Sequence, residues 1–403
     1  MDFIAPNGKQ FKQTLIALFL GSFVTFADLY STQPVIPVIA DQFQVSPATA
    51  SLSLSVATGA LAIFLFFISF LSNSLDRKRI MLFALFFSSL LSIAVTFCDN
   101  LVILIIIRAF QGAMLAGFPS IAMAYINEEF HPKSIGYVIG IYVSGSSLGG
   151  LSGRVIVGAL SDYFTWNTAI GYLGILSLII SILFWVMLPK SKHFTKSTLR
   201  IKGTLSPVVR SLQNPSLFLL YSNGFLLMGA FVTIYNYVAI PLMKPPYNLS
   251  QTLVGFLFII YLTGTFSSAW MGRLADKNRR SSVILSGILL MIAGALFTLF
   301  TPLVIKVLGL ALFTFGFFGA HSVTSGWVGI LADKSEKAQA SSLYLLFYYA
   351  GSSVVGSLGG VFLGLYGWKG VISVVAVLLI VAITSTIKVN KLITNILDQR
   401  KVS

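Results

Sequence analysis

Three charged residues lie inside long apolar stretches of the sequence. Asp28, Arg108 and Arg154 each fall in a different stretch of about 20 residues, the length that crosses a bilayer as a helix. A charge costs about 2.5–3.5 kcal/mol in a membrane, and charges retained there usually serve ion or substrate movement. Burial favours the neutral form of a carboxyl group, whereas a nearby arginine favours its ionised form. The pattern therefore predicts an aspartate that gains and loses a proton.

These three charges are expected to lie at similar depth. At 1.5 Å per helical residue, each lies about 8–11 Å below the outer surface. We expect Asp28, Arg108 and Arg154 to form one intramembrane cluster, in which protonation of Asp28 changes the access of the protein to one side of the membrane. The alternative is a static pair of Asp28 with one arginine, which fixes the first helix against its neighbours.

Apolar residues dominate the chain that must position these groups. Of 403 residues, 56 % are hydrophobic and 10 % are charged, against about 25 % charged in soluble domains. The predicted spans are 12–33, 49–72, 79–97, 101–127, 134–160, 166–188, 215–241, 251–273, 281–300, 303–327, 337–364 and 369–388. The sequence predicts an all-α integral membrane protein with twelve transmembrane helices.

The basic residues predict the orientation of these helices. The formal net charge is +15, and 22 of the 27 lysines and arginines fall on the cytoplasmic side, whereas only Lys244, Lys306 and Lys369 fall on the outer side. This bias places both termini in the cytoplasm, and we expect a multi-pass protein of the bacterial cytoplasmic membrane. The charge fits anionic lipid rather than nucleic acid. The basic N-terminus resembles a signal peptide, but the apolar run after it is too long and lacks a cleavage site, so we interpret it as the first span.

The two halves of the chain repeat one another. Gly-Ser-Ser at 145–147 recurs at 351–353, and the segment from Leu71 is echoed by the one from Leu274. Between the halves, residues 189–214 are polar and basic. We expect two pseudo-symmetric six-helix bundles, residues 1–188 and 215–403, the second ending in a short cytoplasmic tail, joined by a cytoplasmic linker, 189–214. Two parallel six-helix repeats are one layout of secondary transporters.

Three motifs resemble those of the major facilitator superfamily, and the resemblance covers essentially the whole chain. Arg108, Gln111 and Gly112 fit the RxxQG motif of its proton-coupled members, and the run Gly145 to Gly150 is close to the antiporter motif, with Ser146 in place of proline. The third motif is the cytoplasmic loop signature, which the second half carries more completely than the first. Its residues in the two halves are Leu71, Asn73, Arg77, Lys78, Gly272, Asp276 and Arg280.

The resemblance is strongest to the drug:proton antiporter branch and its YnfM-type bacterial exporters. It implies the twelve-helix fold of that family, alternating access and a role for Arg108 in proton coupling. The loop signature implies gating and topology rather than substrate contact. We expect Asp276 to accept hydrogen bonds from a neighbouring helix N-terminus, where negative charge is favoured.

Small residues recur every four positions in two spans. Gly145, Gly149 and Gly153 form one groove, next to Gly150 of the antiporter-like motif. The copy in the second half is expected at Ser352, Gly356, Gly360 and Gly364. Such patterns bring helices into close contact. At the repeat offset of the two Gly-Ser-Ser segments, Arg154 corresponds to Gly360, so the arginine is an addition to one half.

Several further polar residues are candidates to line a cavity. They are Gln111, Asn223, Asn236, His321, Tyr344 and Tyr348. His321 can titrate near neutral pH or simply bind a neighbouring helix, and the tyrosines fit lateral packing or interfacial anchoring at least as well. No metal-ligand spacing, nucleophile–base pair or cofactor motif appears, so we expect neither an enzyme nor a metal site.

The leading expectation is proton-coupled export of drug-like, amphipathic or cationic small molecules. We expect no cofactor beyond the proton-motive force. The expected partners are the substrate, protons and membrane lipid, with no nucleic acid and a monomeric state. The alternatives are a sugar or metabolite permease of the arabinose-efflux type, a lipid flippase, or a sensor that transports nothing.

Overall fold

The architecture is all helical, as expected. A computed structural model describes residues 3–4, 8–71, 76–131, 133–192, 201–333 and 336–402, and their only contact of strand type is an isolated bridge between Ile4 and Phe130. The chain divides into two compact units. Unit 1 comprises Met1–Val45, Leu52–Arg200 and Leu249–Phe258; unit 2 comprises Ser46–Ser51, Ile201–Asn248 and Ile259–Ser403.

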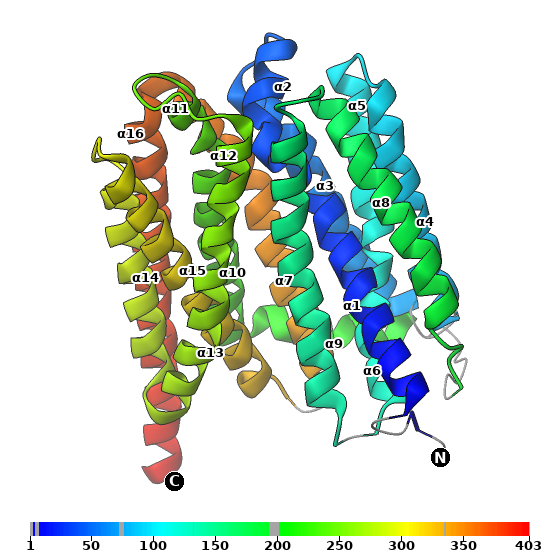
Figure 1. Ribbon diagram of the computed structural model, residues 1–403. Coiled ribbons are helices and arrows are strands. Elements are labelled where there is room, and N and C mark those ends of the chain that lie inside the picture. Colours follow the sequence, from blue (N-terminus) through cyan, green and yellow to red (C-terminus); the bar gives the residue numbers. More distant parts are fainter. Residues whose placement is uncertain are drawn as a thin grey trace. The chain divides into compact units, whose positions relative to one another are not determined.

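Figure 1 labels most of the elements. Those of the first half are α1 (Lys9–Tyr30), η1 (Gln33–Val35), α2 (Ile36–Gln42), α3 (Pro47–Leu71), α4 (Arg77–Ala94), η3 (Val95–Phe97), α5 (Leu101–Leu115), α6 (Gly117–Glu129), α7 (Ile135–Leu160) and α8 (Trp166–Met187). Those that follow are α9 (Ile201–Gln213), α10 (Pro215–Tyr237), α11 (Ala239–Met243), α12 (Gln251–Phe256), η4 (Leu257–Ile260), α13 (Tyr261–Lys277), α14 (Arg280–Phe297), α15 (Leu303–Leu331) and α16 (Lys337–Val402).

Short polar side chains begin several of these helices. Asp76 accepts a hydrogen bond from the Arg79 amide at 2.9 Å before α4, and Asn100 accepts one from the Val102 amide at 2.7 Å before α5. Asn214 does the same before α10, whose first residue is proline. These side chains pair amide groups that a helix start leaves without partners. The starts of these three helices are therefore encoded locally.

Eleven helical segments of the described residues are long and apolar enough to cross a membrane. The last, Gln339–Asn395, is 57 residues long, enough for two passes. Gly367, at φ +61°, breaks the helical geometry inside α16. This left-handed conformation suits glycine, and it separates the last two predicted spans, 337–364 and 369–388.

Two predicted spans are less regular than the sequence suggested. Residues 101–127 were expected as one helix, but α5 ends at Leu115 and α6 begins at Gly117. Residues 251–273 contain the 3₁₀ turn η4 between α12 and α13. Hydrophobic length predicts a span but carries no information about such internal breaks, and 3₁₀ turns inside helices often mark hinges.

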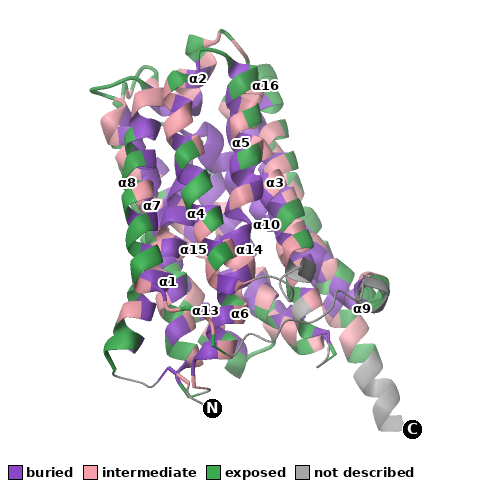
Figure 2. Cartoon of the chain, turned by 90° about the vertical axis from the view of Figure 1, so that its right-hand side faces the viewer, coloured by how far each residue is buried: buried purple, intermediate pink, exposed green. Residues whose placement is uncertain are grey.

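The exposed faces of the helices are apolar. On α8, Ile175, Ile179 and Ile182 are about half exposed, whereas Ser177, Ile180 and Phe184 are buried. Figure 2 shows exposed residues along the length of α8. A soluble protein rarely exposes so much contiguous apolar surface. These faces suit contact with lipid.

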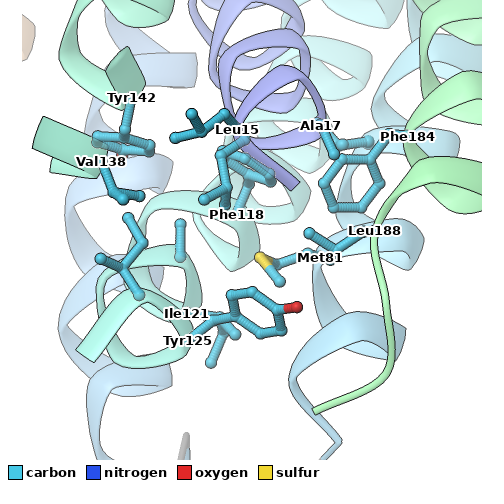
Figure 3. Packing of buried hydrophobic residues seen from close by; sticks show 14 of the residues in the cluster. Leu15, Ala17, Met81, Phe118, Ile121, Tyr125, Val138, Tyr142, Phe184 and Leu188 are labelled. Atoms are coloured by element: carbon cyan, nitrogen blue, oxygen red, sulfur yellow. The ribbon is translucent and has the colours of Figure 1, made fainter. Parts of the chain in front are cut away.

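One apolar core of unit 1 packs together the helices that carry Asp28 and Arg154 with three of their neighbours. Its residues come from α1, α4, α6, α7 and α8 and from the segment before α1. Phe118 lies at its centre, with rings 6.2 Å from Tyr142 and 5.7 Å from Phe184 (Figure 3). Full burial of one such ring contributes about 1.5–3 kcal/mol.

Candidate functional site

Asp28 lies near the end of α1 and is completely buried. Its Oδ1 accepts a hydrogen bond from the Ser177 hydroxyl of α8 at 2.8 Å, and its Oδ2 accepts one from the Ser88 hydroxyl of α4 at 3.5 Å. A hydroxyl can either donate or accept. This environment can therefore satisfy the carboxyl group in its charged or its neutral form.

The Arg108 guanidinium binds the main chain beside Asp28. Its Nη1 donates to the Asp28 carbonyl at 2.9 Å, its Nη2 to the Leu29 carbonyl, and its Nε to the Ser53 carbonyl at 2.9 Å. Arg108 also donates to Gln111 Oε1. These contacts fix the turn that carries Asp28.

Gln111, which the sequence suggests as a cavity-lining residue, belongs to the same hydrogen-bond network. Its Nε2 donates to the Ser88 carbonyl at 3.0 Å and to the Ser92 hydroxyl at 2.6 Å, and its side chain is completely buried. The motif residues Arg108 and Gln111 therefore connect α5 to α1, α3 and α4 around Asp28.

Arg154 has a different set of described contacts. Its Nε donates to Gln33 Oε1 at 2.6 Å and its Nη1 to the Gly150 carbonyl at 2.6 Å. The guanidinium lies 4.1 Å from the centroid of the Tyr30 ring and 4.9 Å from that of Phe258. The described contacts of Arg108 and those of Arg154 both reach the turn that contains Asp28, Leu29 and Tyr30, and the expected cluster of three charges stays a prediction. Equal depth does not specify the direction in which a side chain points around its helix.

The glycine groove of α7 lies against α1. A Cβ atom added at Gly145, Gly149 or Gly153 would come within 3.0 Å of a main-chain oxygen of α1. The helices therefore approach more closely than any larger side chain allows, as the four-residue spacing predicts. Gly150 instead faces the Arg154 guanidinium, which lies 3.2 Å from the position of its Cβ.

In the second half the expected ladder is only partly correct. Gly356 faces Val232 of α10, but Gly360 lies near Ala48 and Tyr237, and Gly364 has no atom within 4 Å of its Cβ position. Gly351 makes the close approach instead, to the Phe225 carbonyl. Gly351 matches Gly145 at the repeat offset, whereas the expected series began one residue later, at Ser352, and so followed the wrong face.

The two asparagines of α10 are buried between helices of unit 2. Asn223 Nδ2 donates to the Thr386 hydroxyl at 2.9 Å, and Asn236 Nδ2 donates to the Gly356 carbonyl at 3.3 Å. Both side chains are completely buried. Their described contacts serve helix packing against α16.

His321 belongs to an aromatic group of α15 and α16. Its Nδ1 lies 2.8 Å from the Tyr344 hydroxyl, and its ring centroid lies 4.6 Å from that of Tyr348 and 5.7 Å from that of Phe317. Tyr344 is buried, whereas His321 and Tyr348 are partly exposed. Phe317, His321, Tyr344 and Tyr348 thus form an aromatic group in unit 2 that contains one imidazole.

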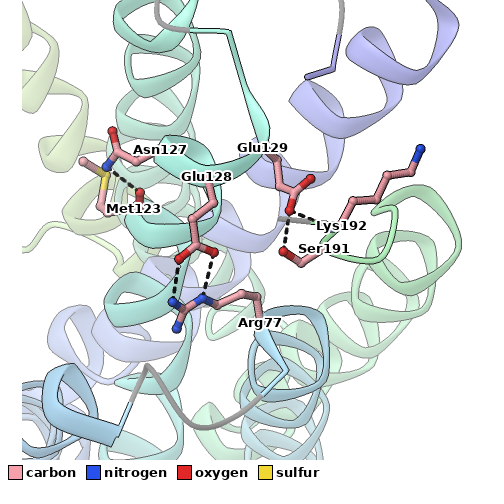
Figure 4. A network of polar contacts seen from close by, with 7 residues as sticks. All are labelled: Arg77, Met123, Asn127, Glu128, Glu129, Ser191 and Lys192. Carbon is pink, nitrogen blue, oxygen red and sulfur yellow. Dashed lines mark hydrogen bonds and ion pairs between the residues drawn. The ribbon is translucent and has the colours of Figure 1, made fainter. Parts of the chain in front are cut away.

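The loop signature forms two separate contacts. Arg77 is buried and donates to both carboxylate oxygens of Glu128 on α6, at 3.1 and 2.6 Å (Figure 4). Lys78 Nζ donates to the Leu188 carbonyl. Asn73 and the side chain of Leu71 lie outside the described residues.

In the second-half copy, Asp276 was expected to meet a helix N-terminus. Its described contact is instead an ion pair of 4.0 Å with Arg280, and its side chain is 77 % exposed. Gly272 has no atom within 4 Å of its Cβ position. This exposed pair between the end of α13 and the first residue of α14 contributes little to stability.

Replacing Glu128 with glutamine is expected to destabilise unit 1. The buried Arg77 would lose its bidentate carboxylate, and hydrogen bonds to charged groups contribute about 1.5–3 kcal/mol. The measurement is the unfolding temperature of the purified protein, with Glu128→Arg combined with Arg77→Glu as the rescue. An unfolding temperature for Glu128→Gln equal to that of the unmodified protein would contradict this expectation.

Sequence reasoning missed the serines around Asp28. Ser88, Ser92, Ser177 and Ser181 are all buried, and Ser88 and Ser177 hold the carboxylate. Their signal is a pair of small hydroxyl residues one helical turn apart in an otherwise apolar span. The pattern is visible in both α4 and α8, but serine is common at helix contacts.

Asp162 was also missed. Its carboxylate accepts hydrogen bonds from the amides of Gln251 at 3.0 Å and Thr252 at 2.9 Å, at the start of α12. Burial alone would raise the pKa of Asp162, but the hydrogen bonds from Thr252, Gln251 and Ser250 hold that pKa below its ordinary value. Nothing local in the sequence links residue 162 to residue 251.

Known proteins resemble this chain along nearly its whole length. An MFS-type transporter of Bacillus subtilis, YybF, is 43 % identical over 383 residues, which are 95 % of each chain. The inner membrane transport protein YnfM of Escherichia coli is 42 % identical over 382 residues, 95 % of this chain and 91 % of YnfM. The crystal structure of a bacterial homolog to the human lysosomal transporter Spinster shares the fold, with a TM-score of 0.78 at 14 % identity over 96 % of this chain and 98 % of that one.

The family model of the Major Facilitator Superfamily matches residues 18–239 and 225–391. The relatives are membrane transporters rather than enzymes, and the described helices are suited to crossing a membrane many times. By the family model, the near full-length relatives and the fold, the chain belongs to the Major Facilitator Superfamily of membrane transporters.

Proposed function

We propose that this transporter exports small amphipathic or cationic molecules in exchange for protons, by alternating access. One observation carries the proposal: Asp28 is a completely buried carboxyl group whose side-chain hydrogen-bond partners are hydroxyls, those of Ser177, Ser88 and Ser92. Neutral partners leave the carboxyl group able to exist with or without a proton, whereas a bidentate arginine would hold it ionised.

Arg108 supports this role without neutralising the carboxylate directly. Its guanidinium donates to the carbonyls of Asp28 and Leu29. Protonation of Asp28 removes a negative charge next to a buried cation, and the network must rearrange or bind another charge. A cationic substrate that competes with the proton for the same carboxylate is one way to couple the two fluxes.

The proposal is tested in everted membrane vesicles that contain the full-length protein. Ethidium, tetraphenylphosphonium and arabinose are offered in turn while an imposed pH gradient is followed by dye fluorescence. We expect a cationic compound to dissipate the gradient and to accumulate. Selective uptake of arabinose would favour a sugar permease, and translocation of a fluorescent lipid analogue would favour a flippase.

Asp28→Asn is expected to abolish the coupling, since the amide cannot exchange a proton in this pH range. Gradient dissipation by the transported compound should fall to the level of vesicles without the protein. The matched control is Asp41→Asn, the same substitution at an exposed aspartate of unit 1. Transport by Asp28→Asn with an unchanged pH dependence would refute the role of Asp28.

A further inference from the structure

Arg154 connects two parts of unit 1 that are distant in the sequence. Toward α1 it contacts Tyr30 and Gln33, which follow Asp28 within two helical turns. Toward the second half of the chain its guanidinium lies 4.9 Å from the centroid of the Phe258 ring. The side chain is 3 % exposed, and attraction between a cation and an aromatic face is stronger when both are removed from water.

The segment Leu249–Phe258, here the α12 segment, is held in unit 1 from both ends. At its start, Asp162 binds the amides of Gln251 and Thr252. In its middle, Gly255 lies against α7, where a Cβ added at Gly158 would come within 2.9 Å of the Gly255 Cα. At its end, Phe258 meets Arg154. Of the residues that make these three contacts, Arg154 also contacts Tyr30 of α1.

The main chain changes conformation where Arg154 makes this contact. Phe258 lies in the 3₁₀ turn η4, and the chain passes from unit 1 to unit 2 directly after it. A 3₁₀ turn inside a longer helix is a common hinge. A change in the contact between Arg154 and Phe258 therefore acts on the main chain just before α13.

The opposite end of this connection lies in the Asp28 network. Arg108 donates to the carbonyls of Asp28 and Leu29, next to Tyr30. A rearrangement of Arg108 shifts the same turn from which Tyr30 and Gln33 contact Arg154. Asp28 and Phe258 are therefore linked by the main chain from residue 28 to residue 33 and by the contacts of Arg154 with Tyr30, Gln33 and Phe258.

We propose that Arg154 is a positioning residue that couples the turn Asp28–Gln33 to the α12 segment, so that loss of the charge on Asp28 loosens the hold of unit 1 on that segment. This inference rests on the proposed function, in which Asp28 changes its charge during transport. It assigns Arg154 a role separate from proton binding.

The test measures opening of the α12 segment directly. Val254 is 1 % exposed, so Val254→Cys, in a background in which the single cysteine Cys98 is replaced by serine, reacts with a maleimide only when the segment opens. The full-length protein is labelled in detergent, and Leu253→Cys, at a 51 % exposed position, controls for thiol reactivity.

Asp28→Asn is expected to raise the labelling rate of Val254→Cys about fivefold or more, the usual lower range of coupling between sites. With Arg154→Gln, the rate should be high already and should no longer respond to Asp28→Asn. Arg154→Lys, which keeps the cation between the rings, should restore part of the response. Lys306→Gln, which removes another buried cation near an aromatic ring, should leave the response intact.

Two results would overturn the inference. One is a response to Asp28→Asn of the same size in the presence of Arg154→Gln, and the other is no response when Arg154 is intact. The proposed function is judged separately, by gradient dissipation in vesicles. If transport is proton-coupled but the labelling rate of Val254→Cys does not respond to Asp28→Asn, the proposed role of Arg154 is wrong and that of Asp28 still stands.

Discussion

Replacing Arg108 with glutamine is expected to lower the stability of unit 1 by more than about 3 kcal/mol. The guanidinium donates to three main-chain oxygens, those of Asp28, Leu29 and Ser53, in a completely buried site. Each hydrogen bond from a charged group contributes about 1.5–3 kcal/mol. A glutamine has too short a side chain and too few donors to replace them.

The loss is measured as the unfolding temperature of the detergent-purified protein, together with the yield of folded protein. Arg108→Lys should be intermediate, because its ammonium keeps the charge but lacks the planar fork that reaches three acceptors. Arg79→Gln, at an exposed position of α4, should stay within about 0.5 kcal/mol of the unmodified protein. An Arg108→Gln protein as stable as Arg79→Gln would show that the network does not hold the turn.

Two glycines of α7 are expected to respond to alanine with opposite signs. At Gly149 the added Cβ would come within 3.0 Å of the Phe23 carbonyl, a main-chain atom that cannot move without separating α1 from α7. Overpacking of this kind costs about 1–3 kcal/mol or more. At Gly140 the Cβ meets no atom within 4 Å, and alanine should stabilise the helix by about 0.5–1 kcal/mol.

The same pair of substitutions distinguishes the effect of packing against α1 from the effect of intrinsic helix propensity. Both residues lie in one helix and undergo the same chemical change, so a difference in unfolding temperature reports the contact with α1. We expect Gly149→Ala to unfold below, and Gly140→Ala at or above, the temperature of the unmodified protein. Equal effects at the two positions would contradict the close approach of α1 and α7.

Much of the fold was predictable, because the length and hydrophobicity of each apolar stretch identify it as a span. The groove of α7 was predictable for a similar reason: a four-residue spacing fixes one face of a helix whatever packs on it. Gly351 and Gly364 show the limit of this reasoning, since the sequence of α16 offers two alternative glycine faces and only the neighbouring helix α10 selects between them.

The candidate site was predictable in its charges and not in its contacts. Asp28 and Arg108 stand out because an apolar span tolerates few charges. Depth along a helix brought Arg154 into the same group, but its direction around α7 turns it toward Tyr30 and Phe258. Ser177 and Asp162 were missed because their partners lie 149 and about 90 residues away in the chain, a separation that no local pattern encodes.

The contact of Asp162 with the start of α12 also has a consequence for the response to pH. Because its pKa lies below the ordinary value of about 3.9, the stabilisation is present above that value and is lost only as the pH falls through the lower, folded-state pKa. A transmembrane proton gradient acts well above this range. The contact at the first turn of α12 is thus insensitive to acidity in that range, and the proposed effect of Asp28 protonation enters the α12 segment at its other end, at Phe258.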